Sequence, residues 1–249
     1  GVFDQIGNMF RIRDLRRRIL ITVGLIALCR VGAYIPLPGI QSAKLAEAME
    51  AARGEGVGAV LGMINMFAGG ALSKGALFGL GIMPYISASI IFQLLANVVP
   101  RLEKLRKEGE AGRKKLNQYT RIATVFICLF QGAVLVRGLY QFGVVPEFDS
   151  WFQSAWFSLS NGFLLMAGTM FLMWIGEQID EHGIGNGISM IIMINILARL
   201  PSQLTLLAQT IQRAESQQNA VLKIGVLMAL FVAIVVAIIY ITQIGRAHV

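Results

Sequence analysis

Long apolar runs separated by polar or proline-containing breaks make up most of the 249-residue chain. A helix needs about 20 apolar residues to cross the roughly 30 Å hydrocarbon core of a bilayer. Prolines at 36, 38 and 100 end the first two runs, and Pro201 bends or ends the fifth. The pattern predicts an all-α membrane protein with about six spanning helices, near 19–35, 75–99, 122–144, 156–175, 188–207 and 221–243.

One apolar segment is too short to cross. Residues 57–67 (VGAVLGMINMF) would extend only about 16 Å as a helix. A half-length helix is tolerated in a membrane only where protein or a water-filled cavity shelters its ends. Glycines at 56, 58, 69 and 70 flank the segment and can absorb backbone rotation. The sequence therefore predicts a re-entrant half-helix beside a cavity through which something passes.

Composition and charge support a membrane protein and suggest its orientation. The chain is 55% hydrophobic and 14% charged, whereas soluble domains average about 25% charged. The net charge of +8 is concentrated in two blocks, at 11–18 and 101–121. Basic blocks beside apolar runs orient helices with the positive side in the cytoplasm, so the N-terminus and the loop 100–121 are predicted to be cytoplasmic. This interpretation is favoured over nucleic-acid binding. The acidic loop 176–187 disagrees mildly.

Two further polar stretches fall outside the membrane in this orientation. The segment 36–56 contains an Ala/Glu-rich piece that predicts a surface helix, and 208–220 predicts a second exterior helix or loop. The glycine-rich run 183–187 (GIGNG) resembles a phosphate loop, but no strand precedes it and no Lys-Ser/Thr pair follows. A tight cytoplasmic turn is the better interpretation.

Ionisable groups are scarce within the predicted spans. Arg30 lies close enough to Pro36 to reach the outer interface, and Cys29 and Cys128 are interpreted as small buried hydrophobes. Neutral polar residues within the spans predict interhelical hydrogen bonds: Gln93, Asn97, Gln131, Asn161 and Asn195. Paired carboxylates, catalytic triads, metal motifs and a Walker A signature are not found, so we expect neither an enzyme nor a bound cofactor or metal. Half of a secondary transporter, a membrane-embedded enzyme and a six-span structural protein remain as alternatives.

Isoleucines recur at helical spacing in two places. Ile82 and Ile86 share one face of a helix, and Ile188 and Ile192 have the same i,i+4 spacing. Spacing alone would fit residues that face lipid. Beside a half-helix, branched apolar side chains could instead form a narrow dry collar, which resists ions by dewetting yet deforms around a wider object.

Six ordered motifs resemble the SecY family, the pore subunits of the bacterial protein translocase. They are 65–73 (NMFAGGALS), 81–90 (GIMPYISASI), 107–113 (KEGEAGR), 117–121 (NQYTR), 168–174 (GTMFLMW) and 183–189 (GIGNGIS). The resemblance extends over nearly the whole chain. It implies a channel of ten helices in two inverted halves, of which this chain holds the N-terminal half.

The resemblance also implies roles for particular residues. The half-helix would be a plug, with Val60, Leu61, Met63, Ile64, Asn65, Met66 and Phe67 in it and Gly69 and Gly70 as its hinge. Ile82, Ile86, Ile188 and Ile192 would form the pore ring. The helix 73–99 and its neighbour 122–144 would form one side of a lateral gate, with Ser87, Ile90, Ile91, Gln93, Leu94, Thr124, Ile127 and Gln131. The cytoplasmic basic loop would present Arg106, Lys107, Arg113, Lys114, Lys115 and Arg121.

The resemblance further implies partners and a location. The cargo would be an unfolded polypeptide, SecE and SecG would be fellow subunits, and a SecA motor or a ribosome would dock from the cytoplasm. The chain would lie in the cytoplasmic membrane of a bacterium. We expect 1–207 to hold five spans and the plug, 208–243 to hold an exterior loop and the sixth span, and 244–249 to be a non-native tail on a truncated fragment.

Overall fold

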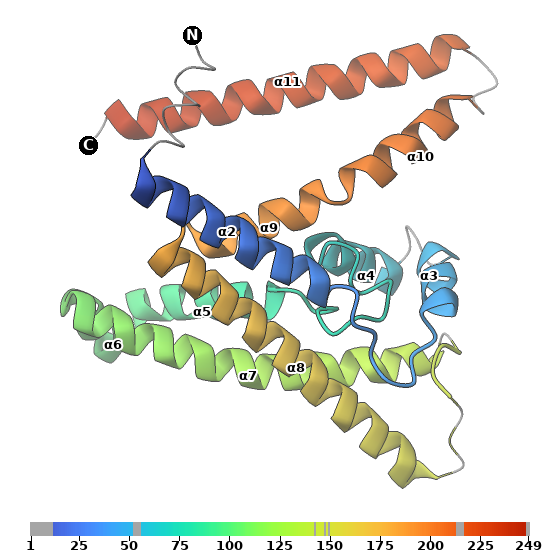
Figure 1. The fold of residues 1–249 in the computed structure, drawn as a ribbon, viewed down its shortest axis with the longest axis horizontal. Helices are drawn as coiled ribbons and strands as arrows, with labels where there is room; N and C mark the ends of the chain where they lie inside the picture. The colour runs from blue at the N-terminus through green and yellow to red at the C-terminus, as the bar shows by residue number, and fades with distance from the viewer. Residues whose placement is uncertain are drawn as a thin grey trace. The chain divides into compact units, whose positions relative to one another are not determined.

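The computed structural model describes residues 12–51, 56–141, 143–146, 148, 150–212 and 217–247. These residues form helices joined by turns (Figure 1). The chain divides into two compact units, Gly1–Arg199 and Leu200–Val249, which we describe separately. The first unit contains α2 (Arg13–Gly32), α3 (Ser42–Ala51), α4 (Gly56–Phe67), α5 (Met83–Val98), α6 (Pro100–Lys107), α7 (Glu110–Gln141), α8 (Trp151–His182) and α9 (Gly187–Leu197). The second contains α10 (Leu200–Gln212) and α11 (Gln217–Ala247).

Among the described residues, four helices are long and apolar enough to cross a membrane, and five if the bent pair α5–α6 counts as one crossing. The four are Glu110–Tyr140, Trp151–His182, Gly187–Leu206 and Gly225–Gln243. The predicted first span, now part of α2, falls outside this count because the first two turns of α2 carry Arg13, Arg16, Arg17 and Arg18. Several long apolar helices nevertheless establish a polytopic helical membrane protein.

The second predicted span begins later than its hydropathy suggested. Residues 68–82 form successive turns, so the predicted helix 73–99 is wrong in its first part and α5 starts at Met83. Gly75 and Gly81 have φ values of 59° and 60°, which end any helix there. The turns are tied to the segment after α2, because Leu37 N donates to Gly75 O (2.7 Å) and Leu77 N donates to Ile35 O (2.8 Å). Hydropathy cannot distinguish an apolar loop that is sheltered in this way from a membrane helix, so the predicted helix began too early.

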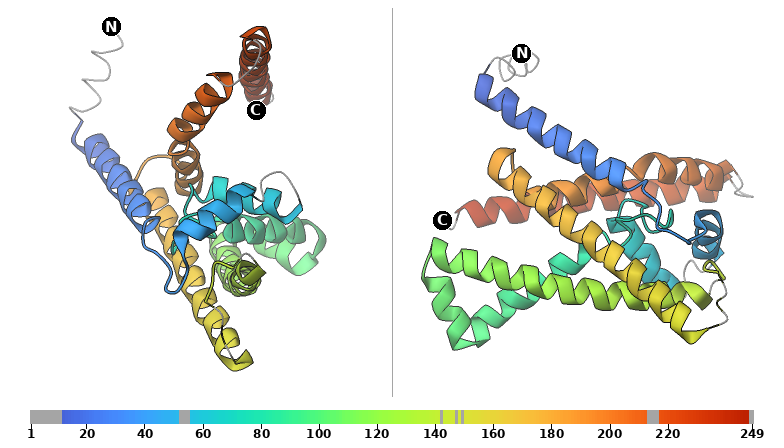
Figure 2. Two further views of the ribbon diagram at one scale, coloured as in Figure 1. Left: turned by 90° about the vertical axis from the view of Figure 1, so that its right-hand side faces the viewer. Right: turned by 60° about the horizontal axis from the view of Figure 1, so that its bottom comes forward.

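The predicted cytoplasmic loop 100–121 is helical. α6 and the first turns of α7 cover almost all of it, and α5 and α6 meet at an angle of 100°. α7 then runs back alongside α5, as the right-hand view of Figure 2 shows. Lys, Arg and Glu are strong helix formers, so the charged composition is compatible with helix outside the membrane.

The segment 36–56, which was predicted to be exterior, contains the helix that was predicted for it, α3. Its Leu45 is 1% exposed and packs with Leu139, near the C-terminal end of α7, and with Val144 and Val145, which follow α7. In the second unit, α10 and α11 cover the predicted segment 208–220 except for 213–216, which lie outside the described residues. α11 contains the whole predicted span 221–243 and continues to Ala247.

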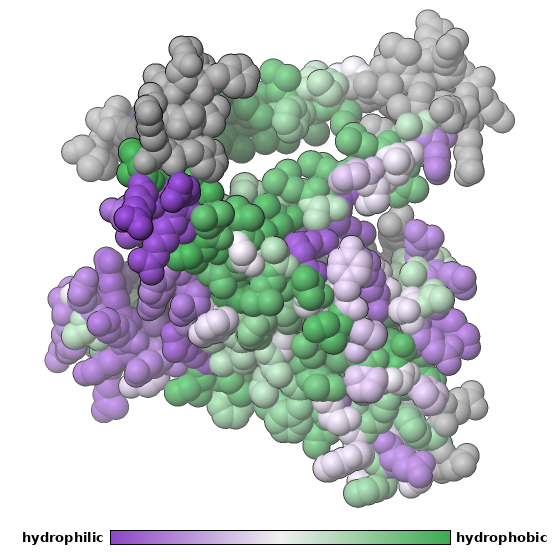
Figure 3. Space-filling view, viewed as in Figure 1, coloured by the Kyte–Doolittle hydropathy of each residue, from purple (hydrophilic) through white to green (hydrophobic). Residues whose placement is uncertain are grey.

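α8 is the central helix of the first unit. It packs against α2, α5, α7 and α9. Close approach to α7 is possible because glycines face each other, and an ideal Cβ at Gly132 would lie 3.1 Å from Gly162 Cα. Apolar surface covers the middle of this unit, and polar surface gathers where α2 begins and over α6 (Figure 3). An apolar surface flanked by polar surface is expected of a protein that spans a bilayer.

Candidate functional site

The half-length helix α4 has one exposed face and one packed face. Its 12 residues extend about 18 Å, well short of a bilayer crossing. Val60, Met63 and Met66 are 53%, 55% and 45% exposed. On the other face Leu61 and Ile64 pack against a cluster that contains Leu72, Leu80, Leu135, Val136 and Leu165. Asn65 is buried and Phe67 is half-buried.

The chain reverses direction directly after α4. Gly69 and Gly70 have φ values of 65° and 86°, in the region that only glycine adopts readily. Their N–H groups donate to Met66 O (3.2 Å) and Asn65 O (2.9 Å), while Asn65 Oδ1 accepts from Ser73 N at 3.0 Å. The two glycines predicted as a hinge thus form a hydrogen-bonded turn at the end of the half-helix. Whether the half-helix rotates about them stays a prediction.

The two isoleucine pairs, which are far apart in the sequence, come together. Ile82 is the N-cap residue of α5 and its O accepts from Ile86 N at 3.1 Å, so these two lie one helical turn apart. Ile188 and Ile192 lie on α9. All four belong to one apolar cluster, hereafter the isoleucine cluster, in which Ile82 is 0% exposed and the other three are half-buried.

The isoleucine cluster contains further side chains that sequence spacing did not indicate. Ile175 and Ile179 of α8 and Ile191 of α9 are almost fully buried in it, and Tyr85 packs against it. The i,i+4 spacing of Ile175 and Ile179 equals that of the predicted pairs. The signal was therefore present in the sequence, but nothing distinguished these two from ordinary core isoleucines.

The end of the half-helix abuts the isoleucine cluster. Ala68 and Ala71, from the turn after α4, are members of that cluster. An ideal Cβ at Gly81 would lie 3.1 Å from Ala68 Cα, so the backbone before Ile82 touches the turn closely. α4 also contacts α9, the helix that carries Ile188 and Ile192. Leu61 and Ile64 pack in a different cluster, so the turn at the end of the half-helix supplies the apolar contact with the isoleucine cluster.

One buried hydroxyl fixes the start of α5. Thr169 Oγ1 donates to Gly81 O at 3.1 Å, across 88 residues of sequence, and Thr169 is 0% exposed. Thr169→Val should leave that carbonyl without this donor and lower the free energy of unfolding by about 1–3 kcal/mol. Denaturant unfolding of the detergent-solubilised chain, followed by tryptophan fluorescence, would measure this.

Thr124→Val is the matched control for that change. Thr124 is equally buried, but its hydroxyl donates at 2.8 Å to Thr120 O of its own helix, which keeps its helical N–H partner. We expect a loss below about 0.5 kcal/mol for this variant. Equal losses for the two variants would contradict a positioning role for Thr169.

The predicted gate residues differ in exposure. On α5, Ile90, Ile91 and Leu94 are 51%, 48% and 62% exposed, and the exposed Gln93 donates to Ser89 Oγ at 3.2 Å. Ser87 is half-buried. On α7, Thr124 is buried and Ile127 and Gln131 are half-buried. The two helices lie against each other. A gating role for these residues stays a prediction.

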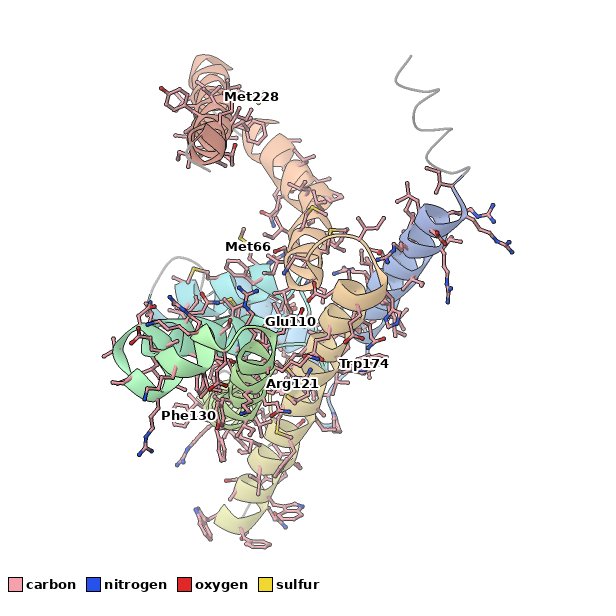
Figure 4. All side chains as sticks on the ribbon, turned by 90° about the vertical axis from the view of Figure 1, so that its left-hand side faces the viewer. Met66, Glu110, Arg121, Phe130, Trp174 and Met228 are labelled. Carbon is pink, nitrogen blue, oxygen red and sulfur yellow. The ribbon has the colours of Figure 1, made fainter. Side chains whose placement is uncertain are left out.

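The predicted basic residues lie on helices. Arg106 and Lys107 are on α6, where Arg106 bonds Asn97 and Lys107 pairs with Glu103 at 2.6 Å. Arg113, Lys114 and Lys115 are exposed in the first turns of α7. Arg121 differs from the rest because it forms an ion pair with Glu177 of α8, and Figure 4 shows it beside that helix. A partly exposed pair of this kind contributes about 1 kcal/mol at most.

Two polar residues of the predicted spans meet at the end of the half-helix. Asn195 Nδ2 donates to Phe67 O at 3.1 Å, and Arg30 Nη1 donates to Asn195 Oδ1 at 3.4 Å. The predicted interhelical role of Asn195 is confirmed. Arg30 is half-buried, and its predicted reach to the outer interface stays a prediction.

The glycine-rich run 183–187 is the tight turn that was predicted. It joins α8 to α9, and Asn186 Oδ1 accepts from Ser189 N at 2.9 Å as the N-cap of α9. Thr22 Oγ1 and Asp180 Oδ1 accept from Ile184 N and Gly187 N, and Arg18 Nη1 donates to Gly183 O. Two backbone N–H groups of the run, those of Ile184 and Gly187, therefore have partners within the protein. Within the part of the chain that the structure describes, no group of three His, Cys, Asp or Glu could hold a metal ion.

Comparison with known proteins gives a consistent result. The family model described as SecY matches residues 76–247. The protein translocase subunit SecY of Escherichia coli K12 is 47% identical over 207 residues, which are 81% of this chain and 44% of that protein. The subunit of the same name from Synechococcus elongatus is 42% identical over 238 residues, which are 95% of this chain and 52% of that protein. The chain thus spans about half the length of the curated relatives it matches.

One solved structure, described as the structure of a protein conducting channel, matches with a TM-score of 0.49 at 17% identity and covers 71% of this chain and 35% of its own. The family assignment rests on the family model and the sequence relatives alone. The motif resemblance, the family match over more than half of the chain and the high identity to the curated subunits agree. The chain belongs to the SecY family.

Proposed function

We propose that this chain is part of a channel that moves unfolded polypeptides across a bacterial cytoplasmic membrane and releases apolar segments sideways into lipid. The observation that carries the proposal is the meeting of Ile82, Ile86, Ile188 and Ile192 in one apolar cluster against the end of the half-helix. The relatives, which are named protein translocase subunits, supply the nature of the cargo. The channel activity requires the remaining half of the relatives' length.

The half-helix would act as the plug and the isoleucine cluster as the ring behind it. A dry apolar ring excludes ions by dewetting. It makes no directional hydrogen bonds, so it can close around a moving chain of any sequence. The exposed face of α4, with Val60, Met63 and Met66, offers little packing against the described residues. Displacement of the plug by an entering chain would therefore break few apolar contacts on that face.

The energy for movement would come from a partner. SecE and SecG would complete the membrane complex, and a SecA motor or a ribosome would dock from the cytoplasm. The exposed Arg113, Lys114 and Lys115 at the start of α7, together with Arg106 and Lys107, form a basic surface suited to such docking. The same basic surface and the arginines at the start of α2 support a cytoplasmic N-terminus.

A chimera tests the proposed function. In it this chain replaces the matching 207 residues of the Escherichia coli subunit, and the cells are depleted of their own subunit. We expect secretion of a signal-peptide reporter to be restored to at least about a tenth of the natural level, because 47% identity preserves the fold. Reporter fusions would map the topology of the chimera. A chimera that reaches the membrane with its N-terminus and residues 100–121 in the cytoplasm, yet secretes nothing, would contradict the proposal.

A further inference from the structure

The last turn of α4 leaves one carbonyl for another element to satisfy. The final four carbonyls of a helix lack intrahelical donors. Those of Ile64, Asn65 and Met66 accept from the N–H groups of Ala68, Gly70 and Gly69 at 2.9–3.2 Å. The fourth, Phe67 O, accepts from the side chain of Asn195 at 3.1 Å. A residue 128 positions away therefore completes the C-terminal cap of the plug helix.

Arg30 fixes the orientation of that side chain. Its guanidinium donates to Asn195 Oδ1, which leaves Nδ2 as the atom that faces Phe67 O. The turn permits the approach only because residue 69 is glycine: an ideal Cβ there would lie 2.7 Å from Arg30 Nη1 and 2.9 Å from Asn195 Oδ1. Arg30 also places a cation at the C-terminal end of α4, where the helix dipole is negative.

Asn195 shares a helix with half of the isoleucine ring. Ile188, Ile192 and Asn195 follow one another at intervals of four and three residues, so they lie on one face of α9. Ile188 and Asn195 are about 10 Å apart along the helix axis. A translocating chain that pushes Ile188 and Ile192 outward would move α9, and Asn195 would leave Phe67 O with it. Opening of the ring and release of the plug would then be one event.

We propose that Asn195, held by Arg30, is a polar latch that keeps the plug closed and couples its release to widening of the ring. The proposal rests on the proposed channel function and adds a positioning role for two residues outside the ring and the plug. Asn195 is 3% exposed, so a merely structural role in core packing is the competing explanation.

Two variants at one position separate these explanations. Asn195→Ala removes the donor and the packing, whereas Asn195→Asp keeps the volume and still accepts from Arg30 but offers no N–H to Phe67 O. We expect both to raise the resting ion leak of the chimera in proteoliposomes about tenfold, the shift that follows from loss of one buried hydrogen bond. They should also lower the dependence of secretion on a functional signal peptide.

Asn161→Ala is the control. Asn161 is 1% exposed and its Nδ2 donates at 3.1 Å to Phe157 O of its own helix, so this amide takes no part in the cap of α4. Its leak should stay within about twofold of the parent because the cap of α4 is intact. A leak that rises in Asn195→Ala but not in Asn195→Asp would overturn the latch in favour of packing, and so would an equal rise in Asn161→Ala.

The outcomes also distinguish the latch from the channel function. A parent chimera that secretes, with unchanged leak in both Asn195 variants, would overturn the latch alone. A parent chimera that does not secrete would contradict the function before any variant is compared. Asn195→Ala could fail to accumulate in the membrane. Asn195→Asp and Gly69→Ala disturb the same hydrogen bond to Phe67 O but keep a side chain of similar volume at position 195. Unchanged leak in these two variants overturns the latch.

Discussion

Replacement of Ile82 by Ala should lower the free energy of unfolding by about 3 kcal/mol, because large-to-small changes at fully buried sites lose both transfer energy and packing. Ile82 is 0% exposed and lies among Phe78, Ile175, Ile179 and Ile191 in the isoleucine cluster. Denaturant unfolding of the purified chimera in detergent would measure the loss. The resting ion leak should rise as well, since the cavity lies in the ring.

Ile90→Ala is the comparison for that change. Ile90 sits two helical turns after Ile82 on the same helix but is 51% exposed. Its truncation should lower the free energy of unfolding by less than about 1 kcal/mol. If Ile82→Ala were no more destabilising than Ile90→Ala, the isoleucine cluster would not be tightly packed in the closed protein. The side chains of the ring would then surround an open pore.

The burial of Ile82 has a consequence for opening. A ring that lined an empty pore would leave its side chains partly solvated, whereas Ile82 has the packing of a core residue. If the isoleucine cluster is the ring of the proposed channel, widening the ring would separate a packed apolar cluster, and the entering chain would have to replace the contacts that are lost. Apolar segments would replace them best, so the proposed channel would open more readily for signal peptides and membrane segments than for polar chains.

Apolar length predicted most of the membrane helices and the half-helix. The apolar runs 156–175 and 221–243 lie inside α8 and α11, and most of the run 122–144 lies inside α7, which ends at Gln141. The half-helix was expected at 57–67, and α4 runs from Gly56 to Phe67. These elements were predictable because each depends on its own composition: lipid requires every backbone group to be satisfied within the segment.

Features that depend on distant contacts were not predictable in the same way. Residues 75–82 are as apolar as a helix, yet they form turns because the segment 35–37 supplies hydrogen bonds to them. The orientation of Arg30 depends on Asn195, 165 residues away. The extent of α6 and α7 was missed for another reason: the charges of 100–121 were interpreted as loop, although Lys, Arg and Glu favour helix.

Gly69→Ala should have the largest effect of any small change in the plug. The added methyl group would lie 2.7 Å from Arg30 Nη1 and 2.9 Å from Asn195 Oδ1, and the residue would be held at a φ of 65°. The left-handed conformation costs a non-glycine residue about 1–2 kcal/mol, and the displaced buried hydrogen bond costs about 1–3 kcal/mol more. Together these favour the open plug by about 3 kcal/mol, or roughly a hundredfold in the resting leak.

Gly62→Ala shows whether the position or the residue type matters. Gly62 lies in the middle of α4, and an ideal Cβ there meets nothing within 4 Å. Alanine is a better helix former than glycine by about 0.5–1 kcal/mol, so this variant should leave the leak unchanged or lower it. If both variants raised the leak equally, replacing any glycine of the plug by alanine would have the same effect. The contact of Gly69 with Arg30 and Asn195 would then not control the leak.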